Sequence, residues 1–420
     1  MTEGAPGSHP DLRVLLYGEF NGGVSESIRF GAFAPYLPGL GVEMRTWASM
    51  APYEVRVPSA LTRDVDRAVH ERRATIDLSP LAWADVVVFR RWYGTAHACL
   101  DCDTVARRAE QLWLHLRATG HRAAGHDIHA RVLFDTLADS RGALQGAAVL
   151  YDTDDDLLGE PGPPGLTARL GAERRDVRSL LALADLVTAS TPVLAERLAP
   201  YARAEVRVVR NALDPAWYEG IPPDVAAAAD PGALRIVYHG PASRMRDYAV
   251  ARAAVDETAA AVPGVRRVWL GAGGDPAAGA AVDGARPWVD GAREFAASLA
   301  AARPGIGLAP LADDRYNRAR SELHWLEYAL AGAPSVLAGF DGPGPYDPVR
   351  DGVDGLVARG PDGWRRQLAA LAASPALRAD LAGAARDRVL AGYTAAARAP
   401  EWAQAYRDAA MRAVGAGQRT

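Results

Sequence analysis

Residues 318–334, RARSELHWLEYALAGAP, form the most informative stretch of this chain. The pattern predicts a loop followed by a helix, and Glu327 is the carboxylate expected on the inward side of that helix. Gly332 and Pro334 are typical of a helix end, and the apolar residues 335–338 then predict a buried strand. Because an unpaired charge among apolar groups costs several kcal/mol, Glu327 is expected to have a partner.

A ribose offers such a partner, since its two vicinal hydroxyls can both donate to one carboxylate. Arg315, Arg318 and Arg320 lie just upstream, where a diphosphate would sit if the ribose met Glu327. This cluster makes a nucleotide-sugar enzyme the leading hypothesis.

Length and composition limit the class of protein. A chain of 420 residues accommodates two domains of ordinary size. Its net charge of −4 argues against general binding of nucleic acids or anionic membranes. There is no apolar run of the length that a membrane helix needs, and residues 1–13 lack the residue order of a signal peptide. We therefore expect a cytoplasmic protein with no nucleic-acid partner and no stable membrane insertion.

The chain contains no lysine, and all 47 of its basic residues are arginines. This excludes a Walker A loop, a pyridoxal Schiff base and a lysine general base. Phosphate binding must then use arginine, backbone N–H groups or helix N-termini.

Cys99 and Cys102 are the two cysteines, and His97 lies beside them. A zinc site needs four ligands, and no second ligand pair follows at a suitable spacing. The alternatives are a reactive pair at the start of a helix or two small loop residues, and we favour the second.

Strand and helix patterns alternate along the first half of the chain. The predicted strands are residues 14–17, 86–89, 147–151, 186–189 and 206–209, and the predicted helices are 28–37, 104–118, 177–184 and 192–199. Continuous apolar strands alternating with helices predict a parallel sheet covered on both faces.

The pattern restarts after a segment rich in Pro, Ala and Asp. The predicted strands are then residues 234–238, 265–270, 288–289, 306–309 and 335–338, with a helix over 248–261. The predicted fold class is α/β, with two facing Rossmann-like doubly wound domains and a cleft between them. Its parts are a first domain (1–213), a linker (214–232), a second domain (233–393) and a C-terminal helix (394–420).

The C-terminal helix carries Trp402 and Tyr406, and Pro400 is expected to break it or to start its second part. Two arrangements remain open from its periodicity. The helix either crosses back onto the first domain or caps the second.

Three segments together resemble the retaining GT-B glycosyltransferases of the family-4 type. SELHWLEYALAGAPSV (321–336) is similar to the E-x7-E region of that family. DLVTASTPVLAERLAPYARAEVRVVRNALD (185–214) is similar to the end of its first domain, and YDPVRDGVDGLVARGPDGW (346–364) to an element near the end of its second. The resemblance extends from about residue 13 to about residue 393, and it is specific for the fold rather than for the sugar or the acceptor.

One departure from the family concerns the first Glu of E-x7-E, which would fall at Ala319. The family role of that Glu, holding the donor sugar, therefore cannot be carried over. Arg320 and Ser321 stand where some branches carry a basic residue and Ser, which implies donor contacts. Glu322 is rotated around the helix from the family position, and we expect it to be solvated.

A second departure is the absence of the family's first-domain histidine. The comparable strand end has Asp152, Asp154 and Asp155 instead. Such a cluster can cap a turn, bind a metal or contact an aminated or polyhydroxylated acceptor. We place Asp152 among the catalytic groups, and Asp154 and Asp155 on the acceptor side.

The resemblance implies that the loop 240–246 binds the donor diphosphate, through its free N–H groups and a basic pair. Arg246 fits the second position of that pair, and Arg244 substitutes for the first, where Pro241 stands. Gly240 and Ser243 would contribute backbone and side-chain contacts. The alternative is that both arginines are solvated.

Two further glycine-containing loops follow predicted strands. Gly22 and Gly23 resemble the glycine pair of the family's first loop, and are expected to approach the ligand closely from the acceptor side unless they form an ordinary turn. Ser25, Ser27 and Arg29 follow and could add contacts.

The loop from Gly271 could instead begin a dinucleotide motif, with Asp290 as its ribose-binding acid, but Pro276 breaks the glycine spacing. We interpret it as a loop on the base side of the donor pocket. Val289 and Asp290 are expected to flank the nucleobase.

By resemblance, the expected reaction is hexosyl transfer from a nucleoside-diphosphate sugar with retention at the anomeric carbon. The leaving diphosphate would act as base for the acceptor hydroxyl, while Arg244 and Arg246 stabilise it. No cofactor or metal is expected. The acceptor is predicted to be a small polar molecule, such as the core of a secondary metabolite. The alternatives are a nucleotide-sugar epimerase, a dehydrogenase and a non-catalytic nucleotide-sugar-binding protein.

Overall fold

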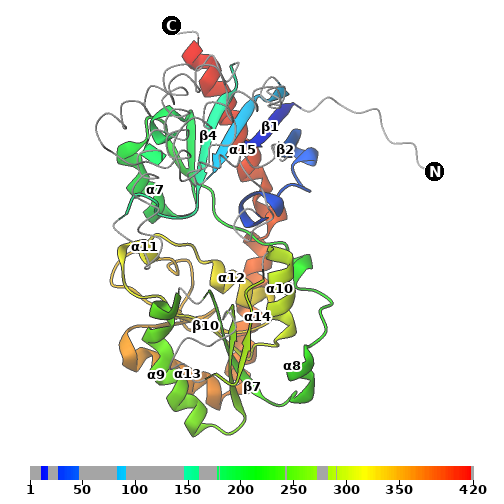
Figure 1. The fold of residues 1–420 in the computed structure, drawn as a ribbon, viewed down its shortest axis with the longest axis vertical. Helices are drawn as coiled ribbons and strands as arrows, with labels where there is room; N and C mark the ends of the chain where they lie inside the picture. The colour runs from blue at the N-terminus through cyan, green and yellow to red at the C-terminus, as the bar shows by residue number, and fades with distance from the viewer. Residues whose placement is uncertain are drawn as a thin grey trace, which may run out of the picture.

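The structure is a computed structural model that describes residues 11–17, 27–46, 83–90, 146–159, 177–178, 180–241, 244–271, 282–289 and 291–417. Its described residues form two α/β domains, each built on a parallel six-stranded sheet (Figure 1). The predicted fold class is confirmed.

The N-terminal sheet has the strand order β2-β1-β3-β4-β5-β6. Its strands are β1 (Leu12–Tyr17), β2 (Val42–Thr46), β3 (Val86–Arg90), β4 (Ala148–Thr153), β5 (Leu186–Ala189) and β6 (Val206–Val208). Every residue of β3, β4 and β5 is buried, which explains why these strands are apolar almost throughout their length. The short strand β2 was missed because Val42 is its one fully buried residue.

The C-terminal sheet has the order β12-β11-β10-β7-β8-β9. Its strands are β7 (Leu234–His239), β8 (Val265–Leu270), β9 (Gly284–Arg286), β10 (Ile306–Ala309), β11 (Ser335–Ala338) and β12 (Leu356–Ala358). The predicted strand at 288–289 is wrong. The edge strand β9 lies at Gly284–Arg286 instead and pairs with β8 over Val268–Leu270, a register that its weakly apolar sequence did not reveal.

Helices and turns connect these strands. The α-helices are α7 (Pro192–Leu198), α8 (Val225–Ala229), α9 (Met245–Ala261), α10 (Ala292–Ala301), α11 (Arg315–Arg318), α12 (Leu323–Leu330), α13 (Gly360–Ala373), α14 (Pro375–Gly392) and α15 (Ala395–Gly417). The predicted helix over 28–37 is replaced by a π-helical turn, η1 (Ser27–Gly31), further turns, and the 3-10 helix η2 (Pro38–Leu40). The predicted helix over 104–118 lies outside the described residues.

The order of the strands reverses once within the C-terminal sheet. In the C-terminal sheet the chain proceeds from β7 outward to β9, then returns to add β10 on the other side of β7. In doubly wound sheets, ligands bind beyond the carboxyl ends of the strands at such a reversal. The residues that follow β7 and β10 are therefore the first place to look for a site.

Helix α15 belongs to the N-terminal core although it follows the last element of the C-terminal domain. It runs unbroken through Pro400 and extends back across the N-terminal sheet (Figure 1). Trp402 is fully buried there, with its ring centroid 5.3 Å from that of Phe30 and 5.9 Å from that of Phe33. The predicted break at Pro400 is wrong, because the helix continues through this residue, the sixth of α15.

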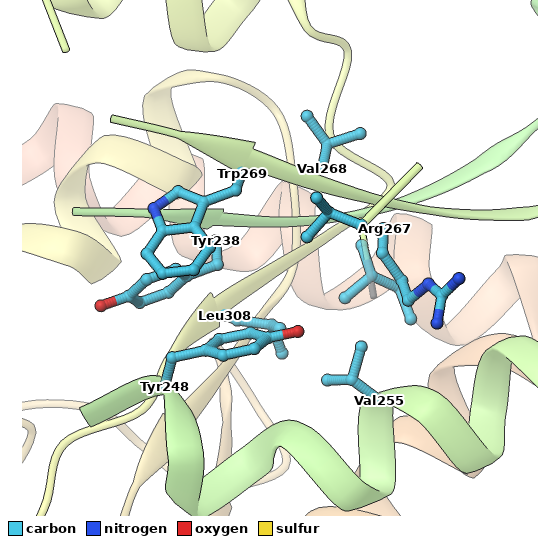
Figure 2. A pocket seen from close by; sticks show the side chains of 9 residues that line it. Tyr238, Tyr248, Val255, Arg267, Val268, Trp269 and Leu308 are labelled. Atoms are coloured by element: carbon cyan, nitrogen blue, oxygen red, sulfur yellow. The ribbon is translucent and has the colours of Figure 1, made fainter. Parts of the chain in front are cut away.

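A cavity of about 10 Å³ lies inside the C-terminal domain, between the sheet and α9 (Figure 2). Tyr238, Tyr248 and Trp269 line it on one side and Val255 and Arg267 on the other. Its size is that of roughly one water molecule. This cavity is a packing gap and cannot hold a nucleotide.

Among the described residues, no helix combines the length and the hydropathy that a membrane crossing requires.

Candidate functional site

Glu327 faces the carboxyl end of β7, at the reversal of the C-terminal sheet. Its carboxylate oxygen Oε2 lies 3.1 Å from Nε2 of His239, the last residue of β7. The two residues are 3% and 4% exposed, and neither of these atoms makes a well-oriented hydrogen bond within the described part of the chain. The inward carboxylate therefore lies beside an imidazole ring and retains capacity to accept further hydrogen bonds.

His324 completes this corner of the site from the first turn of α12. Its ring lies edge-on to that of His239, with centroids 4.4 Å apart, and its Nδ1 is 3.0 Å from the hydroxyl of Tyr346. Burial holds the pKa of His324 well below its ordinary value, and the nearby His239, Arg320 and Arg244 lower it further. The imidazole is therefore neutral at physiological pH.

These three side chains could also hold a metal ion, because one ligand atom from each of His239, His324 and Glu327 lies within 4.8 Å of the others. Two imidazoles and one carboxylate suit zinc and other divalent transition metals. However, Arg244 and Arg320 are close enough to depress the pKa of His324, and the same positive charges oppose a cation. These two arginines weigh against a cation at the triad and offer hydrogen-bond donors to an anion beside it.

Arg244 is the basic residue best placed to meet that anion. Its guanidinium lies over the ring of Tyr316 at 5.2 Å and 3.7 Å from Asp247. Burial lowers the pKa of Arg244, and the positive charge of Arg320 lowers it further. The buried Nη1 of Arg244 makes no hydrogen bond within the described part of the chain. Two neighbouring arginines with an unused donor form an arrangement that an anion would stabilise.

Arg246 has a different environment from the one expected. Its side chain is 58% exposed and lies 3.4 Å from Asp314. The described geometry thus brings Arg244 together with Arg320 and leaves Arg246 on the surface beside an acid. Arg244 therefore has a second arginine near it, Arg320, which comes from a loop distant in sequence.

Gly240 and Gly271 bring two loops into backbone contact above these residues. Both have positive φ angles, +155° and +105°, and a Cβ on Gly271 would lie 2.6 Å from the carbonyl oxygen of Gly240. That oxygen also accepts a hydrogen bond of 2.8 Å from Nε1 of Trp269. Glycine at position 271 is required by this close approach.

The segment after β9 contributes Trp288 and Val289 near Gly271. Trp288 stacks on Phe295 with centroids 6.0 Å apart, and its ring borders Gly271. Val289 is partly exposed. Gly22, Gly23, Ser243 and Asp290 lie outside the described residues, as do Cys99 and Cys102.

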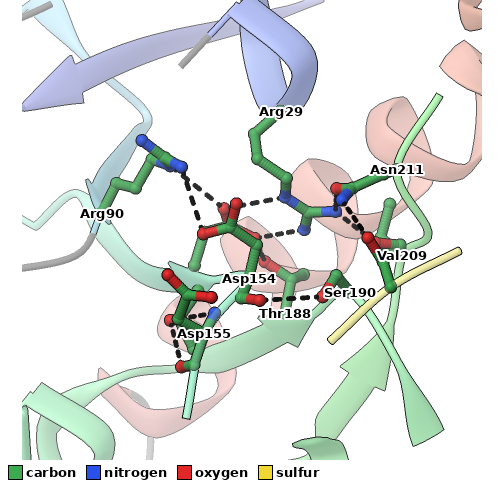
Figure 3. Close-up of polar contacts among 11 residues, drawn as sticks. Arg29, Arg90, Asp154, Asp155, Thr188, Ser190, Val209 and Asn211 are labelled. Atoms are coloured by element: carbon green, nitrogen blue, oxygen red, sulfur yellow. Dashed lines mark hydrogen bonds and ion pairs between the residues drawn. The ribbon is translucent and has the colours of Figure 1, made fainter. Parts of the chain in front are cut away.

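Asp152 lies in a buried network at the end of β4, rather than on an exposed face. Figure 3 labels Arg29, Thr188 and Asn211 of this network. Arg29 binds both of its carboxylate oxygens, and the hydroxyl of Thr188 donates to Oδ1 at 2.7 Å. Burial alone would lower the pKa of Arg29, but the facing carboxylate raises it above its ordinary value. Because Asp152 is 0% exposed and saturated by these donors, the expectation that it contacts a substrate is not supported by the described geometry.

The other two acids of this cluster are partly exposed. Asp154 forms an ion pair of 3.2 Å with Arg90, and its side chain is 15% exposed. The backbone N–H of Asp155 donates to the hydroxyl of Thr153 at 3.3 Å, which closes the turn. Of the three aspartates, only Asp154 and Asp155 remain accessible enough to meet an acceptor.

The segment around Ala319 forms the junction between the domains. Ala319 is 1% exposed and packs within the core of the N-terminal domain. Glu322, expected to be solvated, is instead 0% exposed and bound through both carboxylate oxygens to Nη1 of Arg210, at 3.1 and 3.2 Å. The expectation was wrong because it used only the helix periodicity around Glu322. Periodicity within one segment does not show that the N-terminal domain covers the side of the helix on which Glu322 lies.

Four residues of this region were not singled out from the sequence: His239, His324, Arg210 and Asn211. His324 could have been found, because it precedes Glu327 by three residues and so lies on the same helix face. His239 directly precedes Gly240 at a strand end, which is the position where ligand-binding residues gather. The contacts of Arg210 and Asn211 depend on how the two domains meet, and no local pattern indicates them.

Comparison with known protein families gave a match to the C-terminal part of the chain. Residues 246–404 match the family model described as glycosyl transferase-like. No curated protein sequence matches the chain significantly.

Several solved structures share the fold over nearly the whole chain. Sucrose-phosphate synthase from Thermosynechococcus elongatus has a TM-score of 0.57 at 13% identity, covering 94% of this chain and 98% of its own. Anabaena HepE in complex with UDP-glucose has a TM-score of 0.52 at 13% identity, with coverages of 94% and 98%. An α-glucosyltransferase in complex with UDP-glucose and DNA containing an abasic site has a TM-score of 0.55 at 11% identity, with coverages of 94% and 99%. At these identities the likeness shows the arrangement of two facing domains.

Proposed function

We propose that the protein transfers a sugar from a nucleoside-diphosphate sugar to a hydroxyl of a small polar acceptor, with retention at the anomeric carbon. The proposal is supported by the match of residues 246–404 to the glycosyl transferase-like family and by the GT-B fold of the chain. The observation that carries the proposal is the position of Glu327. Its buried carboxylate lies at the reversal of the C-terminal sheet and has unused accepting capacity.

The donor nucleotide would bind across this corner. Glu327 accepts hydrogen bonds from the two ribose hydroxyls, and the base lies toward Gly271, Val289 and Asp290. The partly exposed ring of Trp288 provides an apolar surface in the same region. A nucleoside is therefore held by a carboxylate on one side and by apolar and backbone groups on the other.

The diphosphate would lie between the ribose and the N-terminal domain. Arg244 and Arg320 neutralise its charge, with the backbone around Gly240 and Ser243 and the side chain of Ser321 as further donors. Neutral His324 is close to Glu327 and near both arginines, so its one N–H can donate a hydrogen bond to a phosphate oxygen. Arg246 would join only if its contact with Asp314 were released.

Chemistry at this site would depend on stabilising the leaving group. The bond from the anomeric carbon to the diphosphate breaks as the acceptor oxygen attacks from the same face, and the acceptor proton passes to the departing phosphate oxygen. Arg244 and Arg320 stabilise the charge that develops there, in a buried site where such stabilisation is strongest. Arginine then supplies the counter-charge that a divalent metal would otherwise provide, so no metal is required.

The acceptor would approach from the N-terminal domain. Asp154 and Asp155 stand at the carboxyl end of β4, where partly exposed carboxylates can hold hydroxyl or amino groups. Gly22 and Gly23 are expected on the same side. A small polyhydroxylated or aminated acceptor fits this chemistry, and we also propose that the protein acts in the cytoplasm, on a secondary metabolite. Asp155→Asn that leaves the KM for every active acceptor unchanged would remove Asp155 from this role.

A non-catalytic nucleotide-sugar-binding protein is the second candidate. It is favoured by Ala319, which replaces the carboxylate expected to hold the donor sugar. Such a protein would bind the nucleotide sugar through Glu327 without turnover. A nucleotide-sugar epimerase would consume the donor without any acceptor.

A thermal-shift screen of the purified protein with UDP, GDP, dTDP, ADP and NAD⁺ tests the proposal. A ligand at one hundred times its Kd should stabilise the folded state by about 2.7 kcal/mol, which raises the melting temperature. UDP is the first nucleotide to test because Anabaena HepE, with the same fold, is known in complex with UDP-glucose.

Glu327→Gln should abolish the shift, while Glu257→Gln, on the surface of α9, should leave it intact. Stabilisation by NAD⁺ alone would refute the proposal in favour of a dehydrogenase. Stabilisation by a nucleoside diphosphate without consumption of the corresponding sugar donor would favour the binding protein.

A further inference from the structure

Residues 315–322 of the C-terminal domain contact the N-terminal domain at several points. Near the start of the segment, Nε of Arg315 lies 3.3 Å from Asp156. In the middle, the carbonyl oxygen of Ala319 accepts a hydrogen bond of 2.8 Å from the hydroxyl of Thr191. The segment leads directly into α12, the helix that carries Glu327.

The strongest contacts are at the end of this segment and involve two consecutive residues that follow β6. Arg210 binds both carboxylate oxygens of Glu322, at 3.1 and 3.2 Å. The side-chain amide of Asn211 donates to the hydroxyl of Ser321 at 2.8 Å. Burial raises the pKa of Glu322, which is 0% exposed, and Arg210 is the arginine that hydrogen-bonds its carboxylate and opposes this shift.

Asn211 also connects to the interior of the N-terminal sheet. Its Oδ1 accepts a hydrogen bond of 3.1 Å from Nη1 of Arg29, whose guanidinium binds Asp152 at the end of β4 (Figure 3). A continuous set of polar contacts therefore extends from the carboxyl end of β4 to the beginning of α12. Each of its side chains is held by at least one hydrogen bond.

Geometry makes α12 sensitive to these contacts. Glu322 is the N-cap of α12, and Glu327 follows five residues later, about 7.5 Å along the helix axis. A rigid helix of this length transmits any displacement of its first turn to Glu327. In group transfer, a misplacement of about 1 Å can cost a factor of about 100 in rate.

We infer that Arg210 and Asn211 are positioning residues that fix helix α12, and with it the nucleotide-binding carboxylate of Glu327, relative to the acceptor side of the N-terminal domain. This inference rests on the proposed function, because the contacts can couple nucleotide binding to the relative position of the two domains only if nucleotide binds at Glu327. Nucleotide bound at Glu327 restricts the motion of α12. Through the contacts of Arg210 and Asn211 with Glu322 and Ser321, it also restricts the motion of the segment after β6.

An ion pair that only stabilises the fold can be distinguished from one that also couples α12 to the N-terminal domain. Removing Arg210 alone leaves the carboxylate of Glu322 buried and unpaired, so Arg210→Met lowers the melting temperature under either interpretation. Replacing both charges, as in Arg210→Met/Glu322→Leu, removes the buried charge and recovers most of the loss. The double variant thus separates stability from coupling.

Hydrogen–deuterium exchange with and without the best-binding nucleoside diphosphate among UDP, GDP, dTDP and ADP measures the coupling directly. In the unaltered protein, nucleotide should slow amide exchange at residues 323–330 and also at residues 206–213. In Arg210→Met/Glu322→Leu, protection at residues 323–330 should persist, whereas protection at residues 206–213 should fall to the level without nucleotide.

Arg207→Met/Asp408→Leu is the matched control, because that pair, 2.6 Å apart, links β6 to α15 without touching residues 315–322. It should retain protection in both segments. Protection at residues 206–213 that survives in the Arg210 double variant, or that is absent from the unaltered protein, would overturn the coupling. Absence of protection at residues 323–330 in the unaltered protein would instead overturn the nucleotide site itself.

Discussion

Arg29→Met should be among the most damaging single substitutions in the N-terminal domain. The variant keeps the length and much of the volume of the side chain but removes its charge. Asp152 is then left fully buried with the hydroxyl of Thr188 and a distant contact, 3.9 Å, to Nε of Arg90. Asn211 also loses the hydrogen bond that its side-chain oxygen accepts from Arg29.

The magnitude follows from the burial of the pair. Breaking a buried ion pair by removing one partner costs about 3–5 kcal/mol. At about 2–4 °C per kcal/mol for a domain of this size, the melting temperature should fall by about 6–20 °C. Because Arg90 partly compensates the charge of Asp152, we expect a fall in melting temperature near the lower end of this range.

Urea denaturation and calorimetry measure this loss. Arg13→Met is the matched control, because Arg13 pairs with Asp85 at the surface, where such pairs contribute about 0–1 kcal/mol. Arg29→Met/Asp152→Leu should recover most of the stability, since the buried charge is gone. A loss for Arg29→Met no larger than that for Arg13→Met would refute the reasoning.

Three further perturbations have defined outcomes. Ala319→Glu should destabilise the protein by several kcal/mol, because the new carboxylate would enter the apolar core of the N-terminal domain; urea titration that shows unchanged stability would contradict the described packing. Because the pKa of His324 in the folded protein is well below its ordinary value of 6.5, the unfolded chain binds a proton that the folded chain does not, and the free energy of unfolding should fall as the pH drops below about 6.5, by at most about 1.4 kcal/mol per pH unit. His324→Asn should lose that part of the pH dependence, and an identical slope in the variant would exclude His324 as its source. EDTA should leave the rate of sugar transfer unchanged, whereas a loss restored by a divalent ion would assign a metal to the His239, His324 and Glu327 triad.

Much of the fold could be predicted from local patterns. The predicted strands at 186–189, 265–270, 306–309 and 335–338 coincide with β5, β8, β10 and β11. Strands β5, β10 and β11 are short runs buried on both faces, which makes their pattern clear, whereas β8 has Arg266 exposed and was predicted from the apolar residues at its two ends. The helix over 28–37 failed because its apolar residues serve a turn that packs against α15, so burial there reflects tertiary contact rather than helix periodicity.

The site was predictable where one segment supplies both the residue and its surroundings. Glu327 was placed inward from the apolar residues around it, and it is 3% exposed. The partners of charged residues were harder to predict. Asp152 and Glu322 are neutralised by Arg29 and Arg210, which lie 123 and 112 positions away in the chain. Such pairings depend on how sheets and domains meet, and sequence periodicity carries no information about them.

The position of α15 has a consequence for how the protein is made. Its residues, with Trp402 and Tyr406 at the centre, complete the hydrophobic core formed by Leu12, Val14 and Phe30. Roughly 180 residues separate the end of the N-terminal domain from this helix, and a ribosome adds about 5–20 residues per second, so translation needs about 9–36 s to supply it. During that interval the first domain to emerge has an uncovered apolar face, and the second domain can finish folding before it does. The newly made chain is therefore most vulnerable to aggregation through the N-terminal domain, which is synthesised first.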